Sequence, residues 1–123
     1  MGVFIQKESV SMSGAASETS VTLNRGTGQH VLAVWISFSD YASGDYVQLL
    51  RKDTASTANE RDDSHADSVG VLMAEGYIDN GSLVLEPGNS TVKNAPLLTT
   101  ALRVYISSTQ VGTAYLNIIY EYN

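Results

Sequence analysis

The sequence alternates between apolar and polar residues with a period of two, and this pattern limits what the chain can fold into more than any other feature. Val104 and Ile106 alternate with Arg103 and Tyr105, and the same alternation continues through the segment 113–122. Successive side chains of a β-strand point to opposite faces of the sheet, so a period of two predicts strands with one buried face. Glycine and small polar residues interrupt the pattern repeatedly, which is typical of a sandwich or barrel of short strands.

The alternation and its interruptions predict eight strands, at residues 3–12, 17–24, 30–39, 45–53, 69–78, 82–86, 98–107 and 113–122. Asn80-Gly81 lies between two apolar runs and predicts a hairpin with a type I′ turn. Val111-Gly112 separates the last two strands, which we expect to form an antiparallel pair. The segment 53–68 has no apolar face beyond alanine, so it is expected to be a long polar loop and not a helix.

These elements predict an all-β fold, an eight-stranded antiparallel β-sandwich with a jelly-roll-like topology. The rival topology is an immunoglobulin-like Greek key, although the Cys–Trp–Cys pattern of that fold is absent. At 123 residues the chain has the length of one domain, so residues 1–123 are expected to form a single β-sandwich domain. The chain has no cysteine, which excludes disulfides, thiolate zinc sites and thiol catalysis.

Charge argues against several classes of partner. The formal net charge is −6, and a negative surface repels the phosphates of nucleic acid and anionic lipid. No apolar run approaches the length of about 20 residues that a membrane-spanning helix needs. The first residues lack the basic and apolar regions of a signal peptide, so synthesis in a cytoplasm is expected.

The residues that most often carry chemistry do not gather in a recognisable motif. The two histidines, His30 and His65, lie in different settings, and no Gly-x-Ser-x-Gly elbow accompanies them. Asp63, His65 and Asp67 are spaced like possible ligands of a divalent ion, but their loop lacks the glycine and late glutamate of a calcium-binding loop. We therefore expect no catalytic residue, no cofactor, no bound metal and no enzymatic activity.

The strand at 30–39 is apolar on both faces, which predicts that its outer face is covered either by a loop of the same chain or by another subunit. In a regular strand Leu32, Val34, Ile36 and Phe38 would face the core, together with Leu102, Val104, Ile106, Leu116 and Ile118 from the last two strands. The opposite face then carries aromatic and aliphatic side chains that suit a subunit contact, since aromatic residues are enriched in interfaces. The candidate interface residues are Val31, Ala33, Trp35, Tyr105, Tyr115 and Ile119. Self-association is expected, with a trimer as its simplest ring.

The segments 102–108 and 112–123 resemble the structural proteins of virions, as does the whole chain in being cysteine-free, rich in hydroxyls and punctuated by glycine. The resemblance is to small capsid or decoration proteins of bacteriophages or archaeal viruses. It implies a capsid, minor capsid or decoration protein, located in the virion, with itself and other virion proteins as partners.

Two other functions compete with this one. A carbohydrate-binding, lectin-like or receptor-binding module would use exposed aromatic residues flanked by amides and acids, for which Tyr41, Tyr46 and Tyr77 are the candidates. A cupin-like enzyme would need several metal ligands converging inside a barrel, and two histidines in dissimilar settings argue against it.

Overall fold

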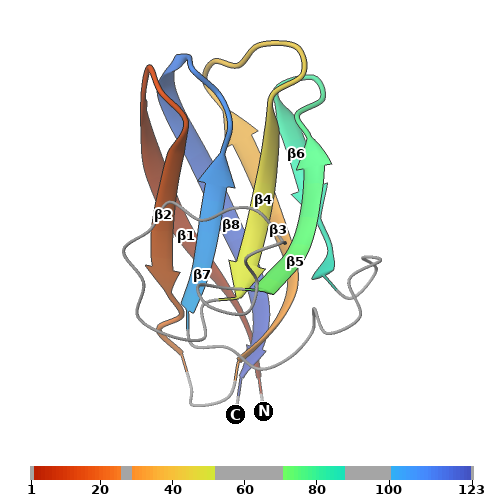
Figure 1. The fold of residues 1–123 in the computed structure, drawn as a ribbon. Helices are drawn as coiled ribbons and strands as arrows, with labels where there is room; N and C mark the ends of the chain where they lie inside the picture. The colour runs from red at the N-terminus through yellow and green to blue at the C-terminus, as the bar shows by residue number, and fades with distance from the viewer. Residues whose placement is uncertain (1, 26–28, 52–70, 88–100, 123) are drawn as a thin grey trace.

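The computed structural model describes residues 2–25, 29–51, 71–87 and 101–122, which form eight antiparallel strands in two sheets (Figure 1). The strands are β1 (Gly2–Ser13), β2 (Ser17–Thr22), β3 (Gln29–Phe38), β4 (Tyr46–Arg51), β5 (Val71–Tyr77), β6 (Ser82–Leu85), β7 (Ala101–Ile106) and β8 (Val111–Tyr122). The all-β prediction is confirmed, and each predicted strand coincides with an observed one. The polar segment 53–68 lies outside the described residues.

The two sheets have the strand orders β1-β8-β3-β6 and β2-β7-β4-β5. The first strand therefore pairs with the last, the second with the seventh, the third with the sixth and the fourth with the fifth. Two further pairings, β3 with β8 and β4 with β7, join these four pairs into two sheets. This is the order produced when one long antiparallel hairpin is wrapped into a sandwich, the jelly roll. The immunoglobulin-like order, in which the first two strands are neighbours, is not observed.

The predicted pairing of the last two strands is wrong. β7 lies between β2 and β4, whereas β8 lies between β1 and β3 in the other sheet. In a wrapped hairpin consecutive strands alternate between the two sheets except at the central pair, β4 and β5. The segment 107–110 therefore crosses from one sheet to the other and does not close a β-hairpin. Closeness in sequence predicted the antiparallel direction of these strands but not their partners.

The turn at Asn80-Gly81 has the predicted conformation. Asn80 and Gly81 have φ values of 52° and 80°, and positive φ at both central residues is the mark of a type I′ turn. The flanking Asp79 and Ser82 exchange two backbone hydrogen bonds of 3.0 Å. Beyond this bridge β5 and β6 separate into different sheets. The predicted hairpin of these two strands is therefore wrong, although its turn is right, and the turn closes the edge of the sandwich.

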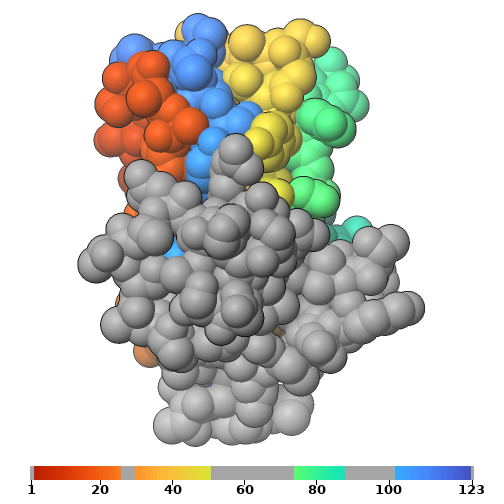
Figure 2. Space-filling model, viewed as in Figure 1, coloured from red at the N-terminus to blue at the C-terminus, as the bar shows by residue number. Residues whose placement is uncertain are grey.

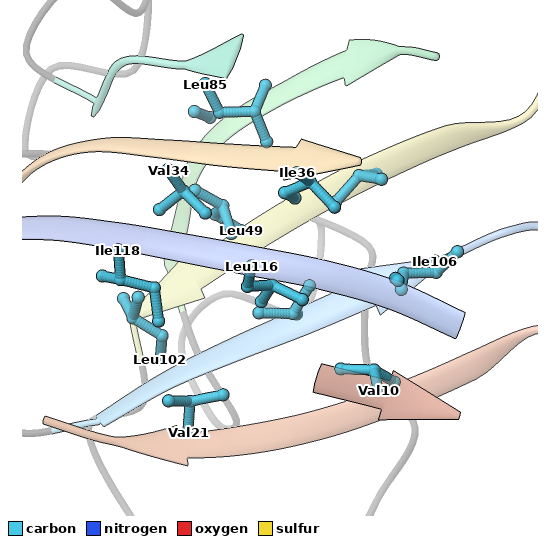
Figure 3. Close-up of a cluster of buried hydrophobic side chains, with 14 of the residues drawn as sticks. Val10, Val21, Val34, Ile36, Leu49, Leu85, Leu102, Ile106, Leu116 and Ile118 are labelled. Carbon is cyan, nitrogen blue, oxygen red and sulfur yellow. The ribbon is translucent and has the colours of Figure 1, made fainter. Parts of the chain in front are cut away.

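One apolar core lies between the two sheets and receives side chains from all eight strands (Figure 3). Seven of the nine residues predicted for it are buried there: Val34, Ile36, Leu102, Val104, Ile106, Leu116 and Ile118. Phe38 is partly buried and packs against the cluster. The ninth, Leu32, does not point into the core, and the reason lies in the register of β3.

A β-bulge in β3 reverses part of the predicted register. Val31 pairs with Tyr120 and Ala33 with Ile119, so that Leu32 is the extra residue between two successive partners. An extra residue shifts the side-chain alternation by one position. Val31 is consequently 0% exposed in the core and Leu32 is 36% exposed, the opposite of the prediction. From Val34 onward the predicted register holds.

A buried polar cluster closes the end of the sandwich where Gly2 pairs with Tyr122. The Tyr120 hydroxyl donates to Gln6 Oε1 at 3.0 Å and accepts the backbone N–H of Arg25 at 3.1 Å. Gln6 Oε1 also accepts the backbone N–H of Asn24 at 3.0 Å, and Gln6 Nε2 donates to the carbonyl of Thr22 at 2.8 Å. These bonds tie the chain after β2 to β1 and β8, which belong to the other sheet.

Candidate functional site

The outer face of the β1-β8-β3-β6 sheet is exposed and unusually apolar. We use the name outer apolar face for eight of its residues, of which six are exposed and two, Ala33 and Ile119, are half-buried: Val3, Ile5, Leu32, Ala33, Trp35, Val84, Tyr115 and Ile119. Trp35 is 54% exposed and Ile5 53%, and Val3, Val84 and Tyr115 are each more than half exposed. Scattered exposed hydrophobic residues are ordinary on soluble proteins, whereas a contiguous set indicates an interaction surface.

The strand register brings several of these residues side by side. Ile5 on β1 lies opposite Ile119 on β8, and Ile119 lies opposite Ala33 on β3. In the next outward-facing row Trp35 on β3 lies opposite Val84 on β6. Directly paired side chains on neighbouring strands have their Cβ atoms about 4.5–5.5 Å apart and so touch. Because Ala33 and Trp35 are two positions apart on β3, these pairs form an apolar band that reaches all four strands.

Polar side chains lie beside this band. The row of Trp35 continues through Asn117 on β8 to Lys7 on β1, and Tyr115 lies between Ser9 and Ser37 in the register.

Four of the six predicted interface residues, Ala33, Trp35, Tyr115 and Ile119, have outward-facing side chains in this sheet. Val31 does not, because the bulge at Leu32 turns its side chain into the core. Tyr105 belongs to β7 in the other sheet and is only 9% exposed.

Sequence reasoning missed Val3, Ile5, Leu32 and Val84 as members of the outer apolar face. A signal for two of them was present, because residues 3–5 are apolar at every position and a strand with one wet face alternates. Val84 could not be assigned without knowing that β6 pairs with β3.

The outer face of the other sheet carries buried polar side chains. Arg103 on β7 and Glu18 on β2 form an ion pair with an N···O distance of 2.9 Å, and each side chain is 4% exposed. Ser20 is the direct partner of Arg103 across the β2–β7 register, so the ion pair runs diagonally between the strands. Leu50, on β4, is also fully buried without belonging to the core between the sheets. The ion pair acts structurally, because both charges are withdrawn from solvent and paired.

A pocket of about 400 Å³ lies on this same face, where β4 begins and β5 ends, and is lined by Tyr46, Gln48, Glu75, Gly76 and Tyr77. In Figure 1 the start of β4 and the end of β5 lie at the end of the sandwich away from the two termini, and Figure 2 shows β4 and β5 toward the upper end of the molecule in yellow and green. Two of the three tyrosines proposed for sugar recognition, Tyr46 and Tyr77, thus come together. The third, Tyr41, is partly buried against the core.

Of the histidine and carboxylate candidates, His30 alone lies in the part of the chain that the structure describes. His30 Nδ1 lies 3.3 Å from Glu121 Oε1, next to it in the β3–β8 register. Among the described residues no group of three histidine, cysteine, aspartate or glutamate side chains is placed to hold a metal ion. Asp63, His65 and Asp67 lie outside the described residues. The described residues also form no helix that is long and apolar enough to cross a membrane.

No protein-family model matches the sequence, and no curated protein matches it.

Proposed function

We propose that this protein is a non-enzymatic structural protein of a virion, a capsid, minor capsid or decoration protein, which functions by assembly through its outer apolar face. The observation that carries the proposal is the apolar band that crosses β1, β8, β3 and β6 with Trp35 at 54% exposure. Jelly rolls are a recurrent architecture of viral capsid domains, and of lectins and cupins as well. The fold is therefore compatible with the proposal and does not select it.

The size of the face suits a stable subunit contact. The strands β1, β8, β3 and β6 have 12, 12, 10 and 4 residues, which at about 3.3 Å per residue and a strand spacing of about 4.8 Å cover about 600 Å². This footprint is of the same order as the roughly 800 Å² of accessible surface that each partner contributes to a standard interface.

A second copy of the chain is the partner that this surface favours. The band consists of aliphatic and aromatic side chains, with Asn117 on β8 opposite Trp35, and with Lys7 on β1 and the His30–Glu121 pair at its borders. Such a centre with a charged rim is the usual anatomy of an interface. A flat face that packs on the same face of another copy produces a two-fold dimer. The trimer expected from the sequence remains a prediction that the same measurement tests.

Sedimentation equilibrium of the purified chain tests the assembly. We expect a wild-type mass at least twice that of one chain, and a monomer for Trp35→Ser and Tyr115→Ser. Tyr77→Ser is the matched control, because Tyr77 is an aromatic residue with 73% exposure on the opposite sheet. It should leave the wild-type mass unchanged.

A strictly monomeric wild type at high concentration would refute self-association. The remaining form of the proposal, docking on a different shell protein, is tested by electron microscopy of virus particles labelled with antibodies against this chain. Unlabelled particles would refute the virion assignment itself.

A further inference from the structure

We propose that the pocket between β4 and β5 binds a neutral sugar. This site lies on the opposite side of the sandwich from the outer apolar face, so it is independent of the assembly proposed above. Its volume of about 400 Å³ falls in the range of roughly 300–1,000 Å³ that small-molecule sites occupy.

Two tyrosine rings form its walls. Tyr46 and Tyr77 are direct partners in the β4–β5 register, with ring centroids 6.3 Å apart and planes at 76°. The Tyr46 ring also packs against that of Tyr105 at 6.0 Å, and Tyr105 is itself buried. Tyr46 is therefore held in place, whereas Tyr77 is 73% exposed and offers its ring to a ligand.

A fixed carboxylate lies beside the rings. Gln48 and Glu75 are the next outward-facing partners in the β4–β5 register, and Gln48 Nε2 donates to Glu75 Oε1 at 2.8 Å. Gln48 is buried, so its amide has little freedom and fixes the orientation of the exposed Glu75 carboxylate. The carboxylate is left with acceptor capacity toward the pocket, because an ionised carboxyl group has about four lone-pair sites.

This combination matches the two surfaces of a pyranose ring. The ring presents a face of C–H groups, which packs on an aromatic side chain, and an edge of hydroxyl groups, which donate hydrogen bonds. Bonds from a hydroxyl to a carboxylate are among the stronger ones in proteins, and tyrosine combines an apolar ring with a polar hydroxyl. A rigid ligand with hydroxyl donors at its edge fits these groups better than a flexible apolar one.

Charge narrows the class of sugar. Glu75 is negative, and the whole chain carries a net charge of −6, so sialylated, sulfated and phosphorylated ligands are repelled. An organic cation is the competing ligand, since tyrosine rings and a carboxylate also attract it. A site for an organic cation places several free ring faces around one point. Here the Tyr46 ring already packs against Tyr105 and is not free to surround a cation. The geometry therefore favours a neutral hexose or N-acetylhexosamine.

The test is a glycan array that carries neutral, N-acetylated and sialylated glycans, followed by calorimetry with the best glycan and with tetramethylammonium. We expect the wild type to bind neutral or N-acetylated glycans. Tyr77→Ser should weaken binding at least tenfold, because it removes the exposed ring. Glu75→Gln keeps the shape of the side chain but turns a charge-assisted bond into a neutral one, so about a fivefold loss is expected.

Trp35→Ser is the matched control, because it replaces an exposed aromatic residue on the opposite sheet and should leave monovalent glycan affinity in calorimetry unchanged. Circular dichroism and the melting temperature show whether each variant is folded, and Tyr77 and Glu75 are both exposed, so folding should persist. The proposal is overturned if no glycan binds, if only sialylated glycans bind, if tetramethylammonium binds in place of sugar, or if Tyr77→Ser binds like the wild type. None of these outcomes changes the mass that sedimentation reports, so the two proposals fail separately.

Discussion

The bulge in β3 predicts that substitution by threonine costs more stability at Val31 than at its neighbour Leu32. Val31 is 0% exposed in the core and Leu32 is 36% exposed on the outer side of the sheet. Val31→Thr barely changes the side-chain volume, but it places a hydroxyl in an apolar core, at a cost of roughly 1–3 kcal/mol in protein mutational data. We expect a loss of about 2 kcal/mol in the free energy of unfolding.

Leu32→Thr is the control, since the new hydroxyl stays within reach of water and threonine suits an exposed strand position. We expect it to cost about 1 kcal/mol or less. For a domain of this size 1 kcal/mol corresponds to a Tm shift of about 4 °C, so Val31→Thr should lower the Tm by about 8 °C.

Both variants are best made in the Trp35→Ser background, where the predicted loss of self-association removes the dependence of Tm on protein concentration. Thermal unfolding by circular dichroism and urea midpoints measure the two costs. The bulge would be refuted if Leu32→Thr proved the more costly change, because a regular strand buries Leu32 and exposes Val31.

Three further substitutions test the polar and backbone features of the sandwich. Tyr120→Phe removes a hydroxyl that is hydrogen-bonded to Gln6, and urea denaturation should show a loss of about 1–3 kcal/mol; an unchanged midpoint would mean that this cluster is not stabilising. Arg103→Met breaks the ion pair with the buried Glu18 carboxylate and should cost about 3–5 kcal/mol in the free energy of unfolding. The added change Glu18→Gln should restore part of this cost. No recovery in the double variant would contradict the ion-pair explanation. Gly81→Ala places a Cβ at a φ of 80° without a close contact, so the expected cost of about 1 kcal/mol arises from backbone conformation alone, and an unaltered Tm would argue against the type I′ turn.

The positions of the strands could be predicted from the sequence because the signals are local. A period of two and the turn residues between strands each depend on a few neighbouring positions. The alternation is strong at 113–122, and the turn signal is strong at Asn80-Gly81. The pairing of the strands is not local. β8 pairs with β1 across almost the whole chain, and nothing near Val111-Gly112 distinguishes that partner from β7. The extra residue at Leu32 likewise depends on how β3 matches β8.

The candidate sites also divide into features that local sequence predicts and features that depend on strand pairing. Trp35 was expected at an apolar surface because its strand is apolar on both faces, and Tyr115 because it lies outward in the alternating segment 113–122. Both are about half exposed. The approach of Tyr46 to Tyr77 could not be predicted, because the segment 52–70 separates the strands that carry them and the register of β4 on β5 decides whether they meet. The sequence therefore identifies suitable residues for sugar binding, and the fold selects which two of them share a pocket.

The position of the pocket relative to the outer apolar face makes assembly and sugar binding compatible. The two surfaces lie on opposite sides of a two-layer sandwich, so packing of β1, β8, β3 and β6 against another subunit leaves β4 and β5 facing outward. An open pocket with one exposed ring gives a weak single contact, but linked copies raise the effective concentration at each further site and strengthen binding to a surface by about 10²–10⁴. Trp35→Ser should consequently leave calorimetric affinity for a single glycan intact while it sharply reduces retention on a densely glycosylated surface. Equal retention of wild type and variant would mean that assembly contributes nothing to recognition.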